Sequence, residues 1–165
     1  MISTDLFAPE PLEAFRGHIK PEWIDFNGHM NVGYYVVAFD LGSMAFLDAV
    51  GMGYTYPERR GGSTFGLEMH VTYDREIHKD DPYVIHTRVL DCDQKRIHMY
   101  HEMHHGTEGW LAATNEIITM HINMKERRSA PFPDDIMETL NRIKEAHAGL
   151  PTPSGVGRKI GIRRK

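Results

Sequence analysis

Asp25-Phe26-Asn27-Gly28-His29-Met30-Asn31, followed directly by Val32-Gly33-Tyr34-Tyr35, is the stretch that decides the fold. Asn31 is a favourable helix N-cap. From residue 32 to about residue 50 the sequence repeats with helical spacing, which predicts one buried face made of Tyr35, Phe39, Gly42, Phe46 and Ala49. The sequence therefore predicts a turn that carries a carboxylate immediately before a long helix.

The predicted start of this helix suits chemistry on a carbonyl group. The first backbone N–H groups of a helix lack internal partners and lie at the positive end of its dipole, so those of Gly33 and Tyr34 are predicted to polarise a carbonyl or hold an oxyanion. Asp25 would supply a base or nucleophile, and His29 and Asn31 bring side-chain donors to the same turn. A plain turn is the alternative, because Asp, Asn and Gly cluster in loops.

The rest of the chain shows strand-like alternation, with Phe65, Leu67, Met69, Val71 and Tyr73 alternating with polar residues or glycine. Strands are predicted near 15–20 and over 64–75, 83–91, 96–105 and 110–124, with a last helix over 134–148. One long helix and consecutive antiparallel strands bury their apolar faces when the helix lies across a curved sheet, an α+β arrangement. We expect an arm at 1–14, one domain at 15–148 and a flexible basic tail at 149–165.

Composition narrows the class of protein. A length of 165 residues with 41% hydrophobic content fits one domain, and a net charge of −4 argues against nucleic acid as the main partner. One cysteine allows no internal disulfide, and the N-terminus lacks a basic segment followed by an apolar one, so we expect a cytoplasmic protein. No apolar run approaches the roughly 20 residues of a membrane span, so no membrane association is expected.

The stretch from Asp25 to Tyr35 resembles the Asp-x-x-Gly-His-x-Asn-x-x-x-Tyr signature of hot-dog-fold acyl-CoA thioesterases of the 4-hydroxybenzoyl-CoA thioesterase-like group. Residues 95–103, 111–116 and 127–133 are similar to a branch that includes betainyl-CoA thioesterases. The resemblance covers about residues 15–133. It implies a hot-dog fold and hydrolysis of a short or polar acyl-CoA to the acid and free CoA, with Asp25 as base or nucleophile and without a metal or cofactor. It also implies a homodimer or a dimer of dimers.

Two further sets of side chains are candidates for binding the substrate. A trimethylammonium group is recognised by aromatic faces and carboxylates, for which the chain offers Trp23, Phe26, Tyr34, Trp110, Glu68 and Glu116. Arginine forks favour phosphate, so the CoA phosphates are assigned to Arg59, Arg60, Lys95, Arg96, Arg127 and Arg128. Ordinary roles compete with these assignments. Aromatic residues pack in cores, a charged side chain on a strand is commonly solvated, and Glu116 beside two isoleucines is either a site residue or a satisfied ion pair.

Other classes of function fit the residues less well. The histidines at 98, 101, 104 and 105 invite a metal site, but on one strand they point to opposite faces, so none is predicted. A hot-dog enoyl-CoA hydratase places His five residues after Asp, whereas Asp25 and His29 are four apart. A non-catalytic acyl-CoA or metabolite-binding module would keep the pocket but lose the base, and the presence of Asp25 counts against it.

Overall fold

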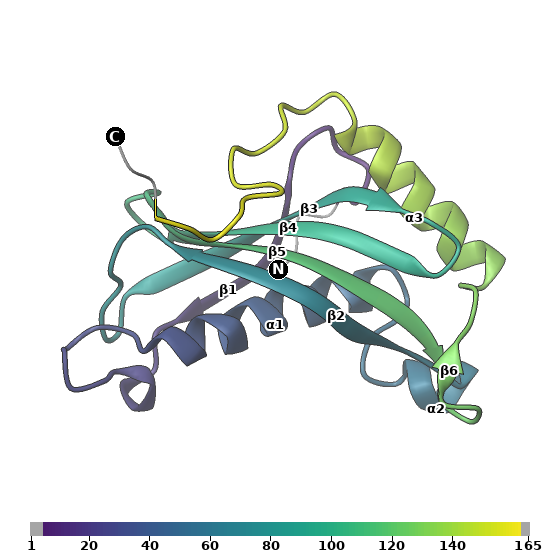
Figure 1. The fold of residues 1–165 in the computed structure, drawn as a ribbon, viewed down its shortest axis with the longest axis horizontal. Helices are drawn as coiled ribbons and strands as arrows, with labels where there is room; N and C mark the ends of the chain where they lie inside the picture. Colours follow the sequence, from purple (N-terminus) through teal and green to yellow (C-terminus); the bar gives the residue numbers. More distant parts are fainter. Residues whose placement is uncertain (1–4, 163–165) are drawn as a thin grey trace.

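The computed structural model describes residues 5–162, in which one long helix lies across a curved antiparallel sheet (Figure 1). The elements in chain order are β1 (Leu12–His18), a 3-10 turn η1 (Pro21–Trp23), α1 (Val32–Ala49), α2 (Tyr56–Arg60), β2 (Gly62–Tyr73), β3 (Pro82–Cys92), β4 (Arg96–His105), β5 (Leu111–Asn123), β6 (Arg128–Ser129) and α3 (Asp134–His147). The strand order is β1-β3-β4-β5-β2, and β6 pairs with β5. The predicted hot-dog arrangement is confirmed.

The helix α1 begins where the sequence predicted. The side-chain oxygen of Asn31 accepts a hydrogen bond from the Gly33 N–H at 3.0 Å, which caps the helix. The helix buries Tyr35, Phe39 and Phe46 against β1, β3 and β4. By length and composition α1 would also pass as a membrane span, contrary to our expectation from the sequence. Core helices pass the same test, and α1 has one face packed on the sheet.

The sheet has an inner face toward α1 and an outer face away from it. Inner side chains form the core, in which Met99 of β4 and Ile117 of β5 pack with Phe46 of α1. Ile136 and Leu140 of α3 extend this cluster, and α3 lies beside β3 (Figure 1). The strands predicted over 83–91 and 96–105 form an antiparallel β3–β4 hairpin, with one bulge between Val89 and Asp91.

Strand β2 forms one open edge of the sheet, and apolar side chains on both of its faces are exposed. Phe65, Leu67, Met69 and Tyr73 are 39–52% exposed, although their alternation predicted a half-buried strand. Most contacts of α1 fall on β1, β3 and β4, and α1 meets β2 at Tyr73, whose ring packs edge-on against Tyr35. A bulge at Leu67 also interrupts the alternation. A single protomer therefore presents an apolar strip on an unpaired edge.

Both ends of the domain differ from the prediction. Strand β1 begins at Leu12, and the side chains of Leu12 and Ala14 are buried, so the last three residues of the predicted arm belong to the domain. Residues 1–4 and 163–165 lie outside the described residues. The described part of the predicted flexible tail is held on the outer face of the sheet by hydrogen bonds from Arg88 and to Glu116. These bonds use backbone groups of the tail, which composition does not reveal.

Candidate active site

Asp25 lies in a tight turn just before α1. Its N–H donates to the His29 carbonyl at 3.1 Å, and its own carbonyl accepts from the Gly28 N–H at 3.0 Å. Gly28 has φ of +84°, a conformation that favours glycine. The Asp25 carboxylate is partly exposed, and its Oδ1 accepts from the Asn27 N–H at 2.8 Å. Among the described residues, Oδ2 has neither a hydrogen bond nor an ion pair, so Asp25 can take a proton or attack an electrophile.

Asn31 occupies the donors that were predicted to hold an oxyanion. Its Oδ1 accepts from the Gly33 N–H at 3.0 Å, and its backbone carbonyl accepts from the Tyr34 N–H at 3.0 Å. Both donors therefore have partners within the chain, because the N-cap and a 3-10-type bond satisfy them. What the helix start offers a carbonyl in this arrangement is the positive end of the dipole. The side-chain NH₂ of Asn31 forms no hydrogen bond with another described residue, so it remains available as a donor.

Of the aromatic residues near Asp25, Trp23 and Tyr34 are already packed and Phe26 is not. Trp23 is buried and stacks on Tyr34, with ring centroids 5.7 Å apart and an interplanar angle of 13°. The Lys20 ammonium lies 5.4 Å from the Trp23 ring centroid. Phe26, at the tip of the turn, is 96% exposed. His29 is partly buried, and its Nδ1 lies 3.3 Å from the Met30 carbonyl oxygen, so its ring helps to fix the turn.

Trp110 packs against the same core cluster as Trp23 and Tyr34, but other residues lie against its ring. His105 stacks on its ring with centroids 4.9 Å apart, and the Arg75 guanidinium lies 4.2 Å from the ring centroid. Its ring therefore already has a cation as a neighbour. The sequence offered no signal for this, because Arg75 comes from the end of β2 and His105 from the end of β4.

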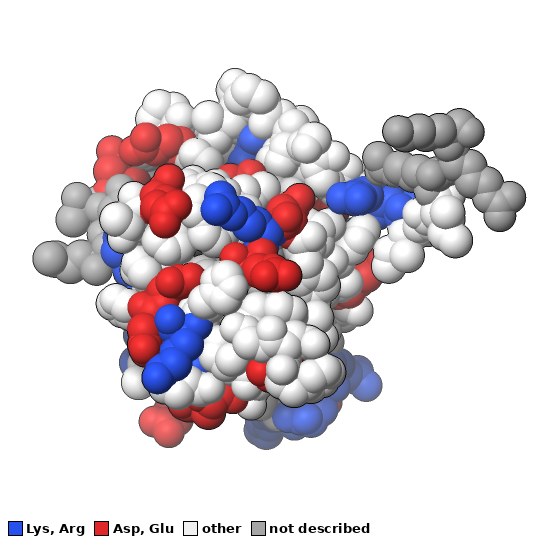
Figure 2. All heavy atoms as spheres, turned by 90° about the vertical axis from the view of Figure 1, so that its left-hand side faces the viewer, with Lys and Arg blue, Asp and Glu red and all other residues white. Residues whose placement is uncertain are grey.

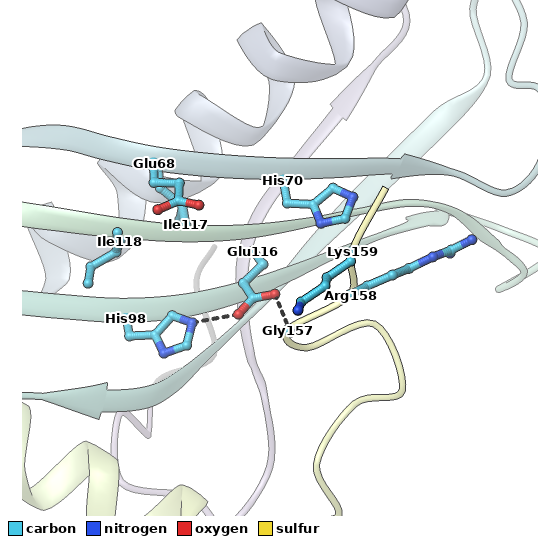
Figure 3. Close-up of a pocket in the computed structure, with 9 residues that line it drawn as sticks. All are labelled: Glu68, His70, His98, Glu116, Ile117, Ile118, Gly157, Arg158 and Lys159. Atoms are coloured by element: carbon cyan, nitrogen blue, oxygen red, sulfur yellow. Dashed lines mark hydrogen bonds and ion pairs between the residues drawn. The ribbon is translucent and has the colours of Figure 1, made fainter. Parts of the chain in front are cut away.

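Glu68 and Glu116 lie on the outer face of the sheet, whereas α1 packs on the inner face. The Glu116 Oε1 lies 2.8 Å from His98 Nε2, and Oε2 accepts from the Gly157 N–H at 2.7 Å (Figure 3). Both carboxylate oxygens of Glu116 thus have hydrogen-bond partners within the protomer. Glu68 is exposed on β2 and lines the same hollow as Glu116. A single protomer does not bring either carboxylate together with Trp23 or Phe26.

The six predicted phosphate-binding cations lie on α2, at the β3–β4 turn and at β6. These elements are near the end of α1, whereas the Asp25 turn lies directly before its start (Figure 1). The 18 residues of α1 give a helix about 27 Å long, and this length separates Asp25 from the cations. Two of the six are already paired: Arg60 bonds Asp135 at 2.6 Å, and Arg96 bonds Asp93 at 2.8 Å. The Arg96 hydrogen bond and those of nearby backbone N–H groups lower the pKa of Asp93 to about 2. Those six are Arg59, Arg60, Lys95, Arg96, Arg127 and Arg128.

Four polar side chains lie together in the core on the inner face of the sheet, and the sequence did not predict this cluster. His101 lies between Ser43 Oγ, at 3.1 Å from Nε2, and Thr87 Oγ1, at 2.9 Å from Nδ1. Asn115, its cross-strand neighbour, is fully buried, and its side-chain amide has no partner among the described residues. Three strands and α1 contribute to this group, so no local spacing could reveal it. Within residues 5–162, no three His, Cys, Asp or Glu side chains are grouped so as to hold a metal ion.

Comparison with protein families and known proteins places this geometry in context. A family model described as a thioesterase-like superfamily matches residues 19–140. A betainyl-CoA thioesterase from Pseudomonas aeruginosa is 31% identical over 151 residues, which cover 92% of this chain and 95% of that protein. An L-carnitine dehydrogenase/betainyl-CoA thioesterase from Rhizobium meliloti is 33% identical over 98% of this chain, which spans 32% of that longer protein.

A solved structure gives a matching result for the fold. A hypothetical protein from Staphylococcus aureus, determined in complex with CoA, superposes with a TM-score of 0.86 and 28% sequence identity. The match covers 93% of this chain and 97% of that chain. The two chains therefore share this fold over most of their length.

Proposed function

The chain belongs to the thioesterase-like superfamily, and from this premise we propose that it hydrolyses a short, polar acyl-CoA to the free acid and CoA, with Asp25 as base or nucleophile. The observation that carries the proposal is the carboxylate of Asp25, which has one unpaired oxygen directly before the N-terminus of α1. The similarity to a betainyl-CoA thioesterase along nearly its full length supports the reaction class.

Two routes are open to Asp25. As a general base, the carboxylate takes a proton from water, the resulting hydroxide attacks the thioester carbonyl, and the C–S bond breaks to release the acid and the CoA thiol. As a nucleophile, Asp25 attacks the carbonyl and forms a mixed anhydride, which water then hydrolyses. The NH₂ group of Asn31 would orient the water or the carbonyl, and His29 would hold the turn. Neither route uses a cofactor.

Replacement of Asp25 by Asn tests this assignment. The variant keeps the shape of the turn, because an amide oxygen can still accept from the Asn27 N–H. We expect the rate of thioester hydrolysis to fall by at least about a hundredfold, the lower end for loss of a positioned acid or base. Thiol release from acyl-CoA measures the rate, and circular dichroism checks the fold. Near-normal turnover by a folded variant would remove Asp25 from the mechanism.

The acyl group that we propose is betainyl, on the strength of the Pseudomonas relative. The protomer supplies no preformed aromatic cage, because the rings of Trp23 and Trp110 already have other residues against them. Phe26 and Tyr34 are the aromatic residues with accessible surface near Asp25. Glu68 and Glu116 would take part in binding the cation only from another subunit.

A neutral isostere of the substrate tests this choice. We expect betainyl-CoA to be hydrolysed with a higher kcat/KM than 3,3-dimethylbutyryl-CoA, because each aromatic contact to the cation adds about 0.5–2 kcal/mol. Steady-state kinetics with the two thioesters gives the ratio, and Phe26→Ala should lower it. Equal hydrolysis of the neutral analogue would exclude a cation site and leave the thioesterase assignment intact.

We also propose that the protein works as a homodimer joined at β2. An exposed strand edge lined by apolar side chains favours pairing with a second copy. Antiparallel pairing across a two-fold axis would place the Gly62 end of one β2 next to the Tyr73 end of the other. Tyr73 lies beside the start of α1, since its hydroxyl donates to the Val32 carbonyl at 3.3 Å. The partner's cations near the Gly62 end would then approach the Asp25 turn and reach the CoA phosphates.

A further inference from the structure

The segment from Gly149 to Ile162, here called the strap, crosses the outer face of the sheet (Figure 1). The Arg88 guanidinium donates to the carbonyls of His147, Leu150 and Pro151, at 3.2, 2.8 and 2.5 Å. Further along, the Gly157 N–H donates to Glu116 at 2.7 Å. Buried or half-buried side chains of the sheet therefore hold the strap by its backbone at two separate places.

The strap follows one cross-strand row of the sheet. Arg88 pairs with Tyr100, Tyr100 with Glu116, and Glu116 with His70, so the four side chains lie side by side on the outer face. The strap itself is fitted to this row. A Cβ added at Gly155 would lie 2.3 Å from the Tyr100 hydroxyl oxygen, and Gly157 has φ of +69°. The path of the strap is thus set by backbone contacts and by two glycines.

Beyond Gly157 the strap presents Arg158 and Lys159 beside His70. These residues line a hollow of about 370 Å³ on one side and one of about 460 Å³ on the other. Glu116 is already bonded to His98 and to the Gly157 N–H. In the described part of the chain, neither Arg158 nor Lys159 forms an ion pair, unlike Arg16, Arg60 and Arg96. In Figure 3, Arg158 extends away from the His98–Glu116 pair.

These two cations lie at the end of the molecule where α1 begins. Tyr73 lines the same hollow as residues 158–161, and its hydroxyl donates to the carbonyl of Val32, the first residue of α1. Figure 2 looks onto this end and shows Lys and Arg side chains there, interspersed with Asp and Glu. The Asp25 turn precedes the same helix end, whereas the six cations chosen from the sequence lie at the other.

We propose that Arg158 and Lys159, together with His70, bind phosphate groups of the CoA part of the substrate. The proposal rests on the acyl-CoA thioesterase function proposed above. Phosphate fits this set because a guanidinium fork and an ammonium without carboxylate partners keep their donors free for anionic oxygens. Arg158 and Lys159 lie outside residues 19–140, the part of the chain that the family model matches, whereas His70 lies inside it.

Kinetics with two thioesters tests the proposal. Acyl-CoA carries the phosphates, and the corresponding acyl-pantetheine carries none. In the double variant Arg158→Ala/Lys159→Ala we expect kcat/KM for acyl-CoA to fall about tenfold through KM, because two exposed charge contacts are lost, and to remain unchanged for acyl-pantetheine. Arg16→Ala/Arg142→Ala removes the same charge on β1 and α3 and should change neither value. Gly155→Ala keeps both cations but displaces the strap, so it should reproduce the selective loss.

Equal losses for the two thioesters, or no loss for acyl-CoA, would overturn the proposal. Calorimetric titration with CoA gives a second readout that does not need turnover. The double variant should bind CoA about tenfold more weakly than the wild-type protein, and the difference should shrink as salt is added. If the wild-type protein hydrolysed no thioester, the proposed function would fail, and the calorimetric comparison would still decide whether the strap binds phosphate.

Discussion

His101 is a single buried titratable residue whose surroundings predict how stability depends on pH. Burial without a charged partner lowers its pKa from 6.5 to about 4. Between these two values the unfolded chain binds a proton that the folded chain does not, so stability is complete above about pH 6.5 and falls as the pH drops toward 4. A shift of this size corresponds to roughly 3 kcal/mol.

Urea unfolding at several pH values measures this contribution. We expect the free energy of unfolding to decrease between pH 7 and pH 4.5, and the decrease to be smaller in His101→Gln, which has no imidazole to protonate. The NMR signal of the His101 ring should stay constant down to about pH 5. A His101 signal that titrates near pH 6.5 would contradict the assignment of a neutral, buried ring.

The Asp25 turn shows which parts of a site a sequence can reveal. Asp25, Gly28 and Asn31 are close along the chain, so their order alone predicts a turn, an N-cap and a helix start, and all three are found. Two other contacts depend on side-chain rotamers and on residues distant in the chain. Asn31 accepts the hydrogen bond of the Gly33 N–H, and the Arg75 guanidinium lies over the Trp110 ring. These contacts decide which groups remain available to a substrate, and local spacing carries no information about them.

Among the elements, α1 depends on close packing at Gly42. A Cβ at this position would lie 2.7 Å from Cγ2 of Ile85 on β3. In Gly42→Ala we expect a loss of about 1–3 kcal/mol in the free energy of unfolding, because the added methyl group forces the helix away from the sheet. Gly33→Ala in the same helix is the control, since its Cβ meets only Asn31 Oδ1 at 3.4 Å. Equal stabilities of the two variants in urea would show that α1 can shift freely.

Strands and helices were predictable to the extent that they bury one face. The 3.6-residue period of α1 and the alternation of β4 follow directly from burial, and their bounds agree with the structure to within a residue. The alternation of β2 was read correctly as a strand, but the expectation of burial on its apolar side was wrong for one protomer. The strap has no periodicity, because its contacts are made by carbonyl and N–H groups that every residue carries.

The whole molecule presents an apolar surface that a second copy would cover. Phe65, Leu67 and Met69 on β2 are 39–52% exposed, and Val32 and Val37 on the neighbouring helix are 57% and 44% exposed. Apolar groups on an open strand edge favour continuing the sheet through a partner. In such a dimer each active site would combine the Asp25 turn of one subunit with cations from the other.

Sedimentation and activity together test this assembly. We expect the wild-type protein to sediment at twice the monomer mass of 18.9 kDa, and Leu67→Lys/Met69→Lys to sediment as a monomer with little activity, because like charges would face each other across the two-fold axis. Tyr54→Lys, at a 74% exposed residue that lines a hollow with Phe15 of β1, should stay dimeric and active. Mixing subunits of the Asp25→Asn variant with subunits of Arg127→Ala/Arg128→Ala should restore part of the activity. In a mixed dimer, one of the two sites then has an unchanged Asp25 and unchanged cations. A fully active monomer would show that one subunit suffices.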